Sequence, residues 1–380
     1  MCGGQAAGMN VLRIAGLPIA VVVAFAAASC ATSTRDTLSA MTLPAEAKQP
    51  WLIAHRGASA LRPEHTLAAY ALAIEQGADA IEPDLVMTRD GVLVARHENA
   101  LSDTTDVAAR AEFADRKARK QIDGAWVTDW FSEDFTLAEL KTLRAVERLP
   151  QLRSTEWDGQ FEVPTFEEIV VLVAAESAKR ERLIGLVPEI KHPTYFAGIG
   201  LAMEQPLLDA LAAHEYTRRA PVVIQSFETA NLRALRTKLP RGGNVRLLQL
   251  LGAPDGAPYD TLTAGAPLTY AQLAAHGLPG IAAYADAIGP HYRMLQIQPR
   301  EDGVGFRSVL VDAAHAQGLQ VFAYTFRPEN GLLDQAFRSQ AAPEARNEDG
   351  AIRELQAYAS AGIDAAFVDD PALARRATRP

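Results

Sequence analysis

The chain has 380 residues, is 48% hydrophobic and carries a formal net charge of −9 at pH 7. This length allows one large domain of roughly 250–300 residues or two smaller ones. The acidic balance argues against a nucleic-acid partner, because phosphate backbones bind to basic surfaces.

The first 29 residues are predicted to be an export signal. Arg13 is their only charged side chain, and it precedes the apolar run IAGLPIAVVVAFAAAS, residues 14–29. Gly16 and Pro18 interrupt this run. It is too short to span a bilayer comfortably, but it suits the core of a secretory signal.

Cys30 follows Ala-Ala-Ser, which resembles the lipobox of bacterial lipoproteins, although Ala27 stands where leucine is typical. The resemblance implies that Cys30 becomes the acylated N-terminus of a periplasmic protein anchored to the membrane. Ordinary signal cleavage, with secretion as a soluble protein, is the alternative. Met9 is an alternative start to Met1, because residues 1–8 do not look like the basic head of a signal.

Cys2 and Cys30 are the only cysteines, and both lie at or before the predicted cleavage site. The mature chain is therefore expected to have no disulfide, so its stability has to come from burial of a hydrophobic core. Residues 30–50 are interpreted as a tether between the membrane anchor and a folded domain at 51–380.

From Trp51 onward, short apolar runs alternate with helical patterns. Residues 51–55 are predicted to be a buried strand, and residues 65–77 place apolar side chains at helical spacing before a glycine. Helices are also predicted at 136–146 and 166–180, both of which begin with capping-box spacing. Further strands are predicted at 78–87, 92–97, 182–191, 221–227, 245–251, 280–284, 319–326 and 364–370.

Nearly continuous apolar strands that alternate with helices indicate a parallel sheet covered by helices. About eight strand–helix units favour an α/β fold of the (β/α)₈ TIM-barrel type. A doubly wound open sheet is the alternative, but it would have a glycine-rich first turn, and HRGAS is not GxGxxG. Residues 99–164 interrupt the pattern and are predicted to be an insertion after the second strand.

Polar and charged side chains recur at the ends of the predicted strands. In a barrel, the carboxyl ends of the strands and the loops after them build the active site. We therefore expect these side chains to meet at one end of the barrel. They are His55, Arg56, Glu82, Asp84, Glu189, Lys191, Gln225 and Tyr324.

The stretch IEPDLVMTRDGVLVARHE, residues 81–98, holds two carboxylates and a histidine. Glu82 and Asp84 are two residues apart in a strand, so they face the same way at roughly 6–7 Å along the backbone. The Asp-Gly dipeptide at 90–91 predicts a two-residue hairpin loop, and in that register Asp84 lies opposite His97.

Two close carboxylates repel each other unless a proton or a cation lies between them. Oxygen ligands favour a hard cation, Ca²⁺ or Mg²⁺, over zinc, and Glu189 on the next strand can supply a third oxygen. A carboxylate pair could alternatively be the acid and base of a glycosidase. The nearby histidines and basic side chains suit a phosphate better.

Four further side chains supply the other chemical groups that displacement at phosphorus requires. Arg56 offers a planar fork of donors for phosphoryl oxygens, and Lys191 offers a point charge. His55 and His97 titrate near neutral pH, so one can accept a proton while the other donates one. A cation and these basic groups would neutralise the charge that builds on the phosphoryl oxygens.

Motifs along the chain from Trp51 to Pro371 resemble those of the glycerophosphodiester phosphodiesterase family. The likeness is carried by IAHRGASALRPEHTLAAY, GADAIEPDLVMTRDGVLVARHE and PEIKHP, and it continues through PTFEE, VIQSF, AYTFRPEN and GIDAAFVDDP. The insertion is similar to that of the periplasmic branch of the family. His65 departs from the pattern, because many members have asparagine there.

The resemblance implies a TIM-barrel enzyme that hydrolyses glycerophosphodiesters to glycerol 3-phosphate and an alcohol. It also implies that the glycerol hydroxyl of the substrate attacks first and that water then opens a cyclic phosphate. The implied roles are acid–base catalysis for His55 and His97, phosphoryl binding for Arg56 and Lys191, and binding of a divalent cation, Ca²⁺ or Mg²⁺, for Glu82, Asp84 and Glu189.

The residues leave two other functions open. A phospholipase D-like or sphingomyelinase-like enzyme shares the barrel and the HR and ExD residues but acts on intact lipid. A surface lipoprotein that keeps the barrel as a non-catalytic binding module is the third reading. Gln225 and Tyr324 would bind the substrate in an enzyme or merely form hydrogen bonds in the barrel mouth. Glu189 and Lys191 could form a purely structural ion pair.

Overall fold

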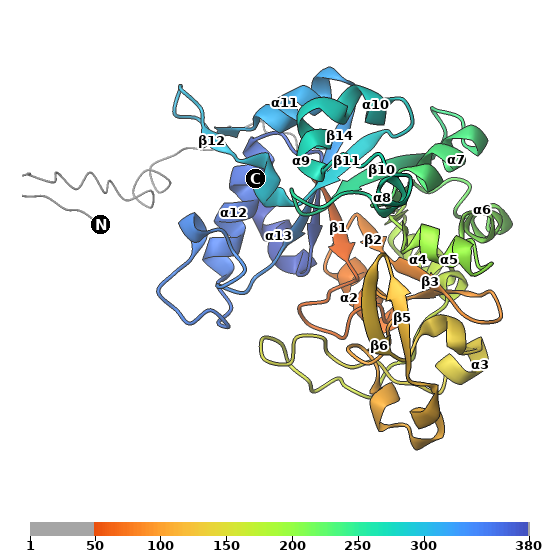
Figure 1. Ribbon diagram of the computed structural model, residues 1–380. Coiled ribbons are helices and arrows are strands. Elements are labelled where there is room, and N and C mark those ends of the chain that lie inside the picture. Colours follow the sequence, from red (N-terminus) through yellow and green to blue (C-terminus); the bar gives the residue numbers. More distant parts are fainter. Residues whose placement is uncertain (1–48, 379–380) are drawn as a thin grey trace, which may run out of the picture.

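Eight parallel strands form a closed barrel in the computed structural model, which describes residues 49–378 (Figure 1). Each strand pairs with its two neighbours, and the pairing of β9 with β10 closes the ring. The TIM-barrel prediction is therefore confirmed. The barrel strands are β1 (Trp51–His55), β2 (Ala80–Glu82), β7 (Gly185–Leu186), β9 (Val222–Ser226), β10 (Val245–Leu251), β11 (Ala287–Pro290), β14 (Gln320–Phe326) and β15 (Ala365–Val368).

Helices surround the barrel and connect its strands (Figure 1). The two predicted capping boxes are present, Thr136 with Glu139 and Thr165 with Glu168. The longer helices are α2 (Leu67–Glu75), α4 (Phe166–Arg180), α6 (Glu204–Ala213), α7 (Ala230–Lys238), α11 (Val309–Ala316), α12 (Glu348–Ser360) and α13 (Pro371–Thr378). The shorter ones are α3 (Leu137–Leu140), α5 (Pro193–Gly198), α8 (Tyr259–Thr263), α9 (Tyr270–Gln272) and α10 (Leu278–Ala282).

Prolines interrupt the second and third barrel strands near their carboxyl ends. Pro83 separates β2 from β3 (Asp84–Met87), and Pro188 lies between β7 and β8 (Glu189–Ile190). Proline has no N–H group to donate to a ladder, so regular pairing stops at each one. Pairing then resumes between β3 and β8, in the register that puts Asp84 beside Glu189.

The hairpin from β3 to β4 (Leu93–Ala95) has a three-residue loop instead of the predicted two-residue loop. Met87 pairs with Leu93, and the Thr88 N–H donates to the Val92 carbonyl at 3.0 Å. The Asp90 carboxylate accepts hydrogen bonds from the Thr88 hydroxyl at 2.6 Å and the Leu137 N–H at 2.9 Å, which pins the tip to α3.

The longer loop shifts the register of the hairpin by one residue. The residue opposite Asp84 is therefore Arg96, whose N–H donates to the Asp84 carbonyl at 3.0 Å. The predicted pairing of Asp84 with His97 is wrong. Gly91 adopts φ +78°, the left-handed conformation that three-residue hairpin loops place at this position.

One predicted strand is a helix. Residues 280–284 lie in and just after α10, where Ile281 and Tyr284 are buried, and the sixth barrel strand is β11, a few residues later. A short apolar run has the same appearance in a buried helix and in a buried strand, so its pattern does not separate the two. The helix predicted at 136–146 is also shorter, because α3 ends at Leu140.

The connection from β4 to α4 contains the inserted segment. It includes the hairpin of β5 (Ala118–Ile122) and β6 (Ala125–Asp129) together with α3. Trp130 is buried there and donates its indole N–H to the Phe113 carbonyl at 2.5 Å, whereas Trp126 is 60% exposed. A second hairpin, β12 (Gln298–Pro299) with β13 (Phe306–Arg307), lies between β11 and α11.

The predictions for the N-terminus lie outside the described residues. These are the signal at 1–29, the alternative start at Met9, acylation of Cys30 and most of the tether at 30–50, and they stay predictions. Between residues 49 and 378, no helix is both long and apolar enough to cross a bilayer.

The turn after β1 requires glycine at position 57. Gly57 has φ +90°, and a Cβ atom there would lie 2.7 Å from the backbone carbonyl carbon of Ala69 on α2. We expect Gly57→Ala to lower the free energy of unfolding by about 1–3 kcal/mol in urea titrations. Gly159→Ala is the matched control, because Gly159 has φ +76° but no atom within 4 Å of its added Cβ. An equal loss in both variants would contradict the close-approach explanation.

Candidate active site

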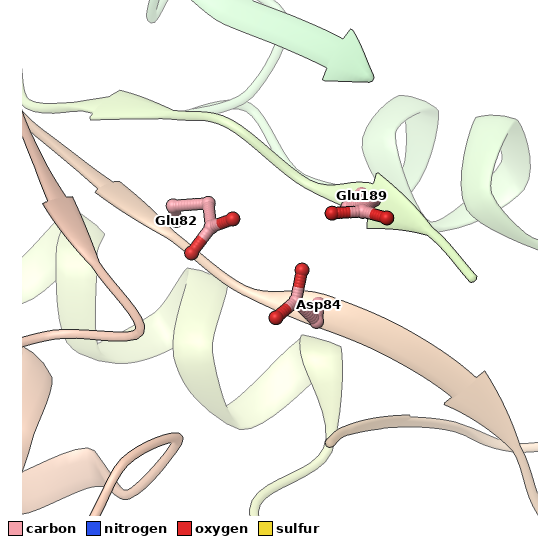
Figure 2. A group of neighbouring side chains, drawn as sticks. All are labelled: Glu82, Asp84 and Glu189. Carbon is pink, nitrogen blue, oxygen red and sulfur yellow. The ribbon is translucent and has the colours of Figure 1, made fainter. Parts of the chain in front are cut away.

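Three acidic side chains converge where the second and third barrel strands are interrupted. Glu82 ends β2, Asp84 begins β3 and Glu189 begins β8. Their exposed fractions are 3%, 0% and 5%. One carboxylate oxygen of each lies within 4.8 Å of the others, and Figure 2 shows the three groups around a common space. The structure thus brings the predicted cation ligands together.

The charges of this group fit a hard divalent cation. Burial and the Asp84 charge raise the pKa of Glu82 well above its usual value. Burial also raises the pKa of Glu189; Lys191 opposes this shift and Asp84 adds to it. Asp84 Oδ1 is buried and has no hydrogen-bond partner within residues 49–378. A cation bound to these oxygens would relieve the repulsion and occupy the unpaired atom.

Asp84 is held in its charged form by its neighbours. Burial alone would raise the pKa of Asp84, but Lys191 and His65 hold it well below the usual range. His65 Nε2 donates to Asp84 Oδ2 at 2.9 Å, and His65 Nδ1 accepts from the Tyr70 hydroxyl at 2.7 Å. The histidine that departs from the family pattern therefore supports one of the acids.

His55 ends β1 and is oriented by a carboxylate from the opposite end of the chain. Its Nδ1 lies 2.6 Å from Asp369 Oδ1, directly after β15. The pKa of Asp369 is well below its usual value because the positive charges of Arg153 and Arg327 outweigh burial, so Asp369 accepts and Nδ1 donates. Burial and Arg56 lower the pKa of His55 to about 4 against the opposing effect of Asp369. Nε2 is then free to accept a proton.

His97 follows β4 and has the same kind of support. Its Nδ1 forms a hydrogen bond with the carboxylate of Glu98. Burial, Arg56 and Lys191 lower the pKa of His97 to about 3, and Glu98 opposes the shift. Burial and the neighbouring positive charges thus favour the neutral form of both histidines, and the negative charge of a phosphodiester would raise the pKa of either one.

Two basic side chains lie beside the acids. The backbone N–H of Arg56 donates to Glu82 Oε2 at 2.9 Å, and its side-chain Nε lies 3.5 Å from Asp84 Oδ2 without a hydrogen-bond partner in the described chain. Lys191 Nζ lies 2.8 Å from Glu189 Oε1. Arg56 thus keeps one donor unused. Lys191 forms the ion pair with Glu189 that its position in the sequence also allowed as a purely structural role.

Gln225 and Tyr324 line the same cavity of about 130 Å³ as His55, His97 and Arg56. Gln225 Nε2 donates to Glu82 Oε1 at 3.0 Å, so this side chain holds one of the acids in place. The Tyr324 hydroxyl donates to the Leu251 carbonyl at 2.8 Å. Of the residues predicted to form the site, only Cys30 lies outside the described part of the chain.

Comparison with known proteins assigns this constellation to a family. The model of the glycerophosphoryl diester phosphodiesterase family matches residues 55–373, a range that contains the three acids, both histidines, Arg56 and Lys191. The chain belongs to this family.

Two glycerophosphodiester phosphodiesterases and one solved phosphodiesterase structure match this chain over most of their length. Glycerophosphodiester phosphodiesterase GDPD6 of Arabidopsis thaliana is 32% identical over 341 residues, which cover 86% of this chain and 85% of that protein. Glycerophosphodiester phosphodiesterase of Haemophilus influenzae is 28% identical over 334 residues, with coverages of 82% and 88%. A phosphodiesterase of Oleispira antarctica, solved in complex with the product sn-glycerol-3-phosphate, shares the fold at a TM-score of 0.53, with 21% identity and coverages of 87% and 96%.

Sequence reasoning missed the carboxylates that orient the two histidines. Asp369 stands beside Asp370, an ordinary helix cap that accepts from the Leu373 N–H at 2.8 Å, so the pair of acids before Pro371 does not by itself indicate a site residue. Glu64, which the sequence motifs did not single out, binds Arg56 at 3.0 Å. The position of Asp369 at the carboxyl end of the last strand was the available signal.

Proposed function

We propose that this protein hydrolyses glycerophosphodiesters to glycerol 3-phosphate and an alcohol. One observation carries the proposal: two carboxylate-oriented histidines line a single cavity with two of three converging acids and an arginine. An acid–base pair beside a cation site and a phosphoryl-binding arginine matches the needs of displacement at phosphorus.

Glu82, Asp84 and Glu189 would hold the divalent cation, for which Ca²⁺ and Mg²⁺ are the candidates. When bound, the cation would supply positive charge to the phosphoryl oxygens as charge builds on them. Arg56, which lines the cavity, would add a second positive charge. Lys191, which shares Glu189, would place a third charge on the same side of the site.

In the first step, the free hydroxyl of the substrate's glycerol that neighbours the ester oxygen attacks phosphorus. One histidine accepts the hydroxyl proton at Nε2, and the other, protonated in the complex, gives its proton to the departing alcohol oxygen. The bond to the head-group oxygen breaks as the bond to the glycerol oxygen forms. The products of this step are a five-membered cyclic phosphate and the free alcohol.

In the second step, water attacks the cyclic phosphate and the two histidines exchange roles. The deprotonated histidine takes a proton from water, and its partner returns one to the glycerol oxygen that leaves phosphorus. Asp369 and Glu98 stabilise the imidazolium form in turn, as a buried carboxylate does for a catalytic histidine. The chain then holds glycerol 3-phosphate, and each histidine has regained its starting protonation state.

The test is release of glycerol 3-phosphate from glycerophosphocholine, with and without a chelator. We expect release in the presence of Ca²⁺ or Mg²⁺ and its loss after chelation, because the three acids repel one another and the phosphate without a cation. Intact phosphatidylcholine and sphingomyelin are the comparison substrates. Cleavage of intact lipid alone would favour the lipid phosphodiesterase alternative, and binding without turnover of any diester would favour the binding module.

A further inference from the structure

A loop of the insertion, residues 146–153, reaches the catalytic end of the barrel. Its backbone is held at one end, where the Val146 N–H donates to the Thr104 carbonyl at 3.0 Å. A turn follows, in which the Arg153 N–H donates to the Leu149 carbonyl at 2.9 Å. The turn sets two arginine side chains, Arg148 and Arg153, toward the barrel.

Arg153 binds the carboxylate that orients His55. Its Nη2 donates to Asp369 Oδ2 at 2.5 Å, while His55 occupies the other oxygen of Asp369. The remaining donors of Arg153 contact Glu329 at 2.7 Å and the Ser59 carbonyl at 2.9 Å. The Arg153 side chain is only 7% exposed, so all of these contacts are desolvated.

Arg148 binds the carboxylate that orients His97. Its Nη2 donates to Glu98 Oε2 at 2.6 Å and to Glu64 Oε1 at 2.8 Å. Its Nε donates to the second oxygen of Glu64 at 2.9 Å, and its Nη1 to the second oxygen of Glu98 at 3.2 Å. Glu64 in turn binds Arg56 at 3.0 Å. The Arg148 guanidinium thus links Glu98, which orients His97, to Glu64, which binds Arg56.

We propose that Arg148 and Arg153 are positioning residues through which the insertion holds both histidines in their working orientation. The inference rests on the proposed function, because it assigns the two histidines to acid–base catalysis. A carboxylate orients an imidazole only while its own position is held, and a planar guanidinium with several directed donors holds it better than a point charge does. The insertion thus contributes to the support of both histidines, and at Asp369 it acts beside Arg327 of the barrel, which donates to Asp369 Oδ2 at 3.0 Å.

Single and paired substitutions test the proposal through activity. We expect Arg153→Met and Arg148→Met each to lower kcat about 10–100-fold with little change in KM, because a misplaced catalytic group slows the chemical step. The lysine variants should retain more activity than the methionine variants. Arg116→Met is the matched control, since Arg116 is a partly buried arginine of the insertion that pairs with Glu139 at 2.6 Å, and it should leave kcat unchanged.

Double mutants separate positioning from general stability. If Arg153 acts through Asp369, Arg153→Met should cost little further activity in an Asp369→Asn background, and Arg148→Met should behave likewise with Glu98→Gln. Groups that act through one another give such non-additive losses, whereas independent structural effects add. Additive losses in both pairs would overturn the proposal.

A measurement that needs no turnover keeps the positioning role separate from the proposed reaction. The imidazole Nδ1–H protons of His55 and His97 should give slowly exchanging signals in nuclear magnetic resonance spectra. Arg153→Met should lose the His55 signal alone, Arg148→Met the His97 signal alone, and Arg116→Met neither. If the wild-type protein cleaves no diester, the proposed function fails while these signals still report on positioning. Unchanged signals in both variants would overturn the positioning role.

Discussion

Replacing His97 with alanine is expected to lower kcat about 10²–10⁴-fold while the protein stays folded. His97 is one of two imidazoles that line the cavity, and Glu98 holds its Nδ1 so that Nε2 can exchange protons. Without it, one of the two proton transfers in each step has to use water. Its side chain is 29% exposed, so its removal leaves the hydrophobic core intact.

The measurement is steady-state turnover of glycerophosphocholine, together with near-ultraviolet circular dichroism of the same samples. His315→Ala is the matched control, because His315 also pairs with a carboxylate, Asp364 at 2.8 Å, but does not line the cavity. It should keep full activity. Undiminished kcat in His97→Ala, or a loss of activity accompanied by a loss of tertiary structure, would contradict the assigned role.

The second large effect is expected for Glu189→Gln, which should weaken cation binding on the order of 100-fold or more and stop turnover. The variant keeps the shape of the side chain but removes one of three charges. In thermal unfolding, wild-type protein should gain about 2.7 kcal/mol at a free cation concentration of 100 times Kd. Glu189→Gln should show no such gain at that concentration.

The pH dependence of this stabilisation has a defined sign. Burial raises the pKa of Glu82 and Glu189 in the cation-free fold, so each binds its proton more tightly there than in the unfolded chain. The free energy of unfolding of cation-free protein should therefore fall as pH rises from 4.5, the usual glutamate pKa, through the raised pKa values of these two groups. Cation binding must displace those protons, so affinity should increase over the same range.

Glu354→Gln provides the control for the cation experiments. Glu354 is a buried glutamate on α12 whose pKa is also raised, to about 8, chiefly by burial, but it lies outside the cavity. This variant should keep the full response to cation and full turnover. A cation response that survives in Glu189→Gln, or disappears in Glu354→Gln, would argue against the three-acid site.

The two arginines of the insertion extend the site beyond the barrel. Asp369 and Glu98 each contact a histidine on one side and an insertion arginine on the other. The residues that touch the substrate would then come from the barrel strands, while the groups that keep them oriented come partly from a separate segment. Substitutions of Arg148 or Arg153 should consequently alter kcat, although neither side chain touches the reacting atoms.

Local patterns in the sequence were sufficient to predict the barrel fold and the acids at its strand ends. Alternating apolar runs and helices indicate a parallel barrel because each strand is buried on both faces. The spacing of Glu82 and Asp84 around Pro83 places two acids at a strand end, and capping boxes mark two helix starts. These features depend on residues within a few positions of one another, so they can be read along the chain.

Contacts between distant segments determined the partners of the site residues and the register of the hairpin. His55 meets Asp369 across 314 positions, and Arg148 meets Glu64 across 84 positions, so no local pattern connects them. Asp90 binds the N–H of Leu137, 47 positions away, in a hairpin whose three-residue loop places Arg96 opposite Asp84. The sequence alone thus determined which chemical groups stand at the strand ends, because burial and spacing are local. Only the tertiary structure determined which carboxylate orients each histidine, because hydrogen bonds between remote segments form only after the barrel and the insertion have packed together.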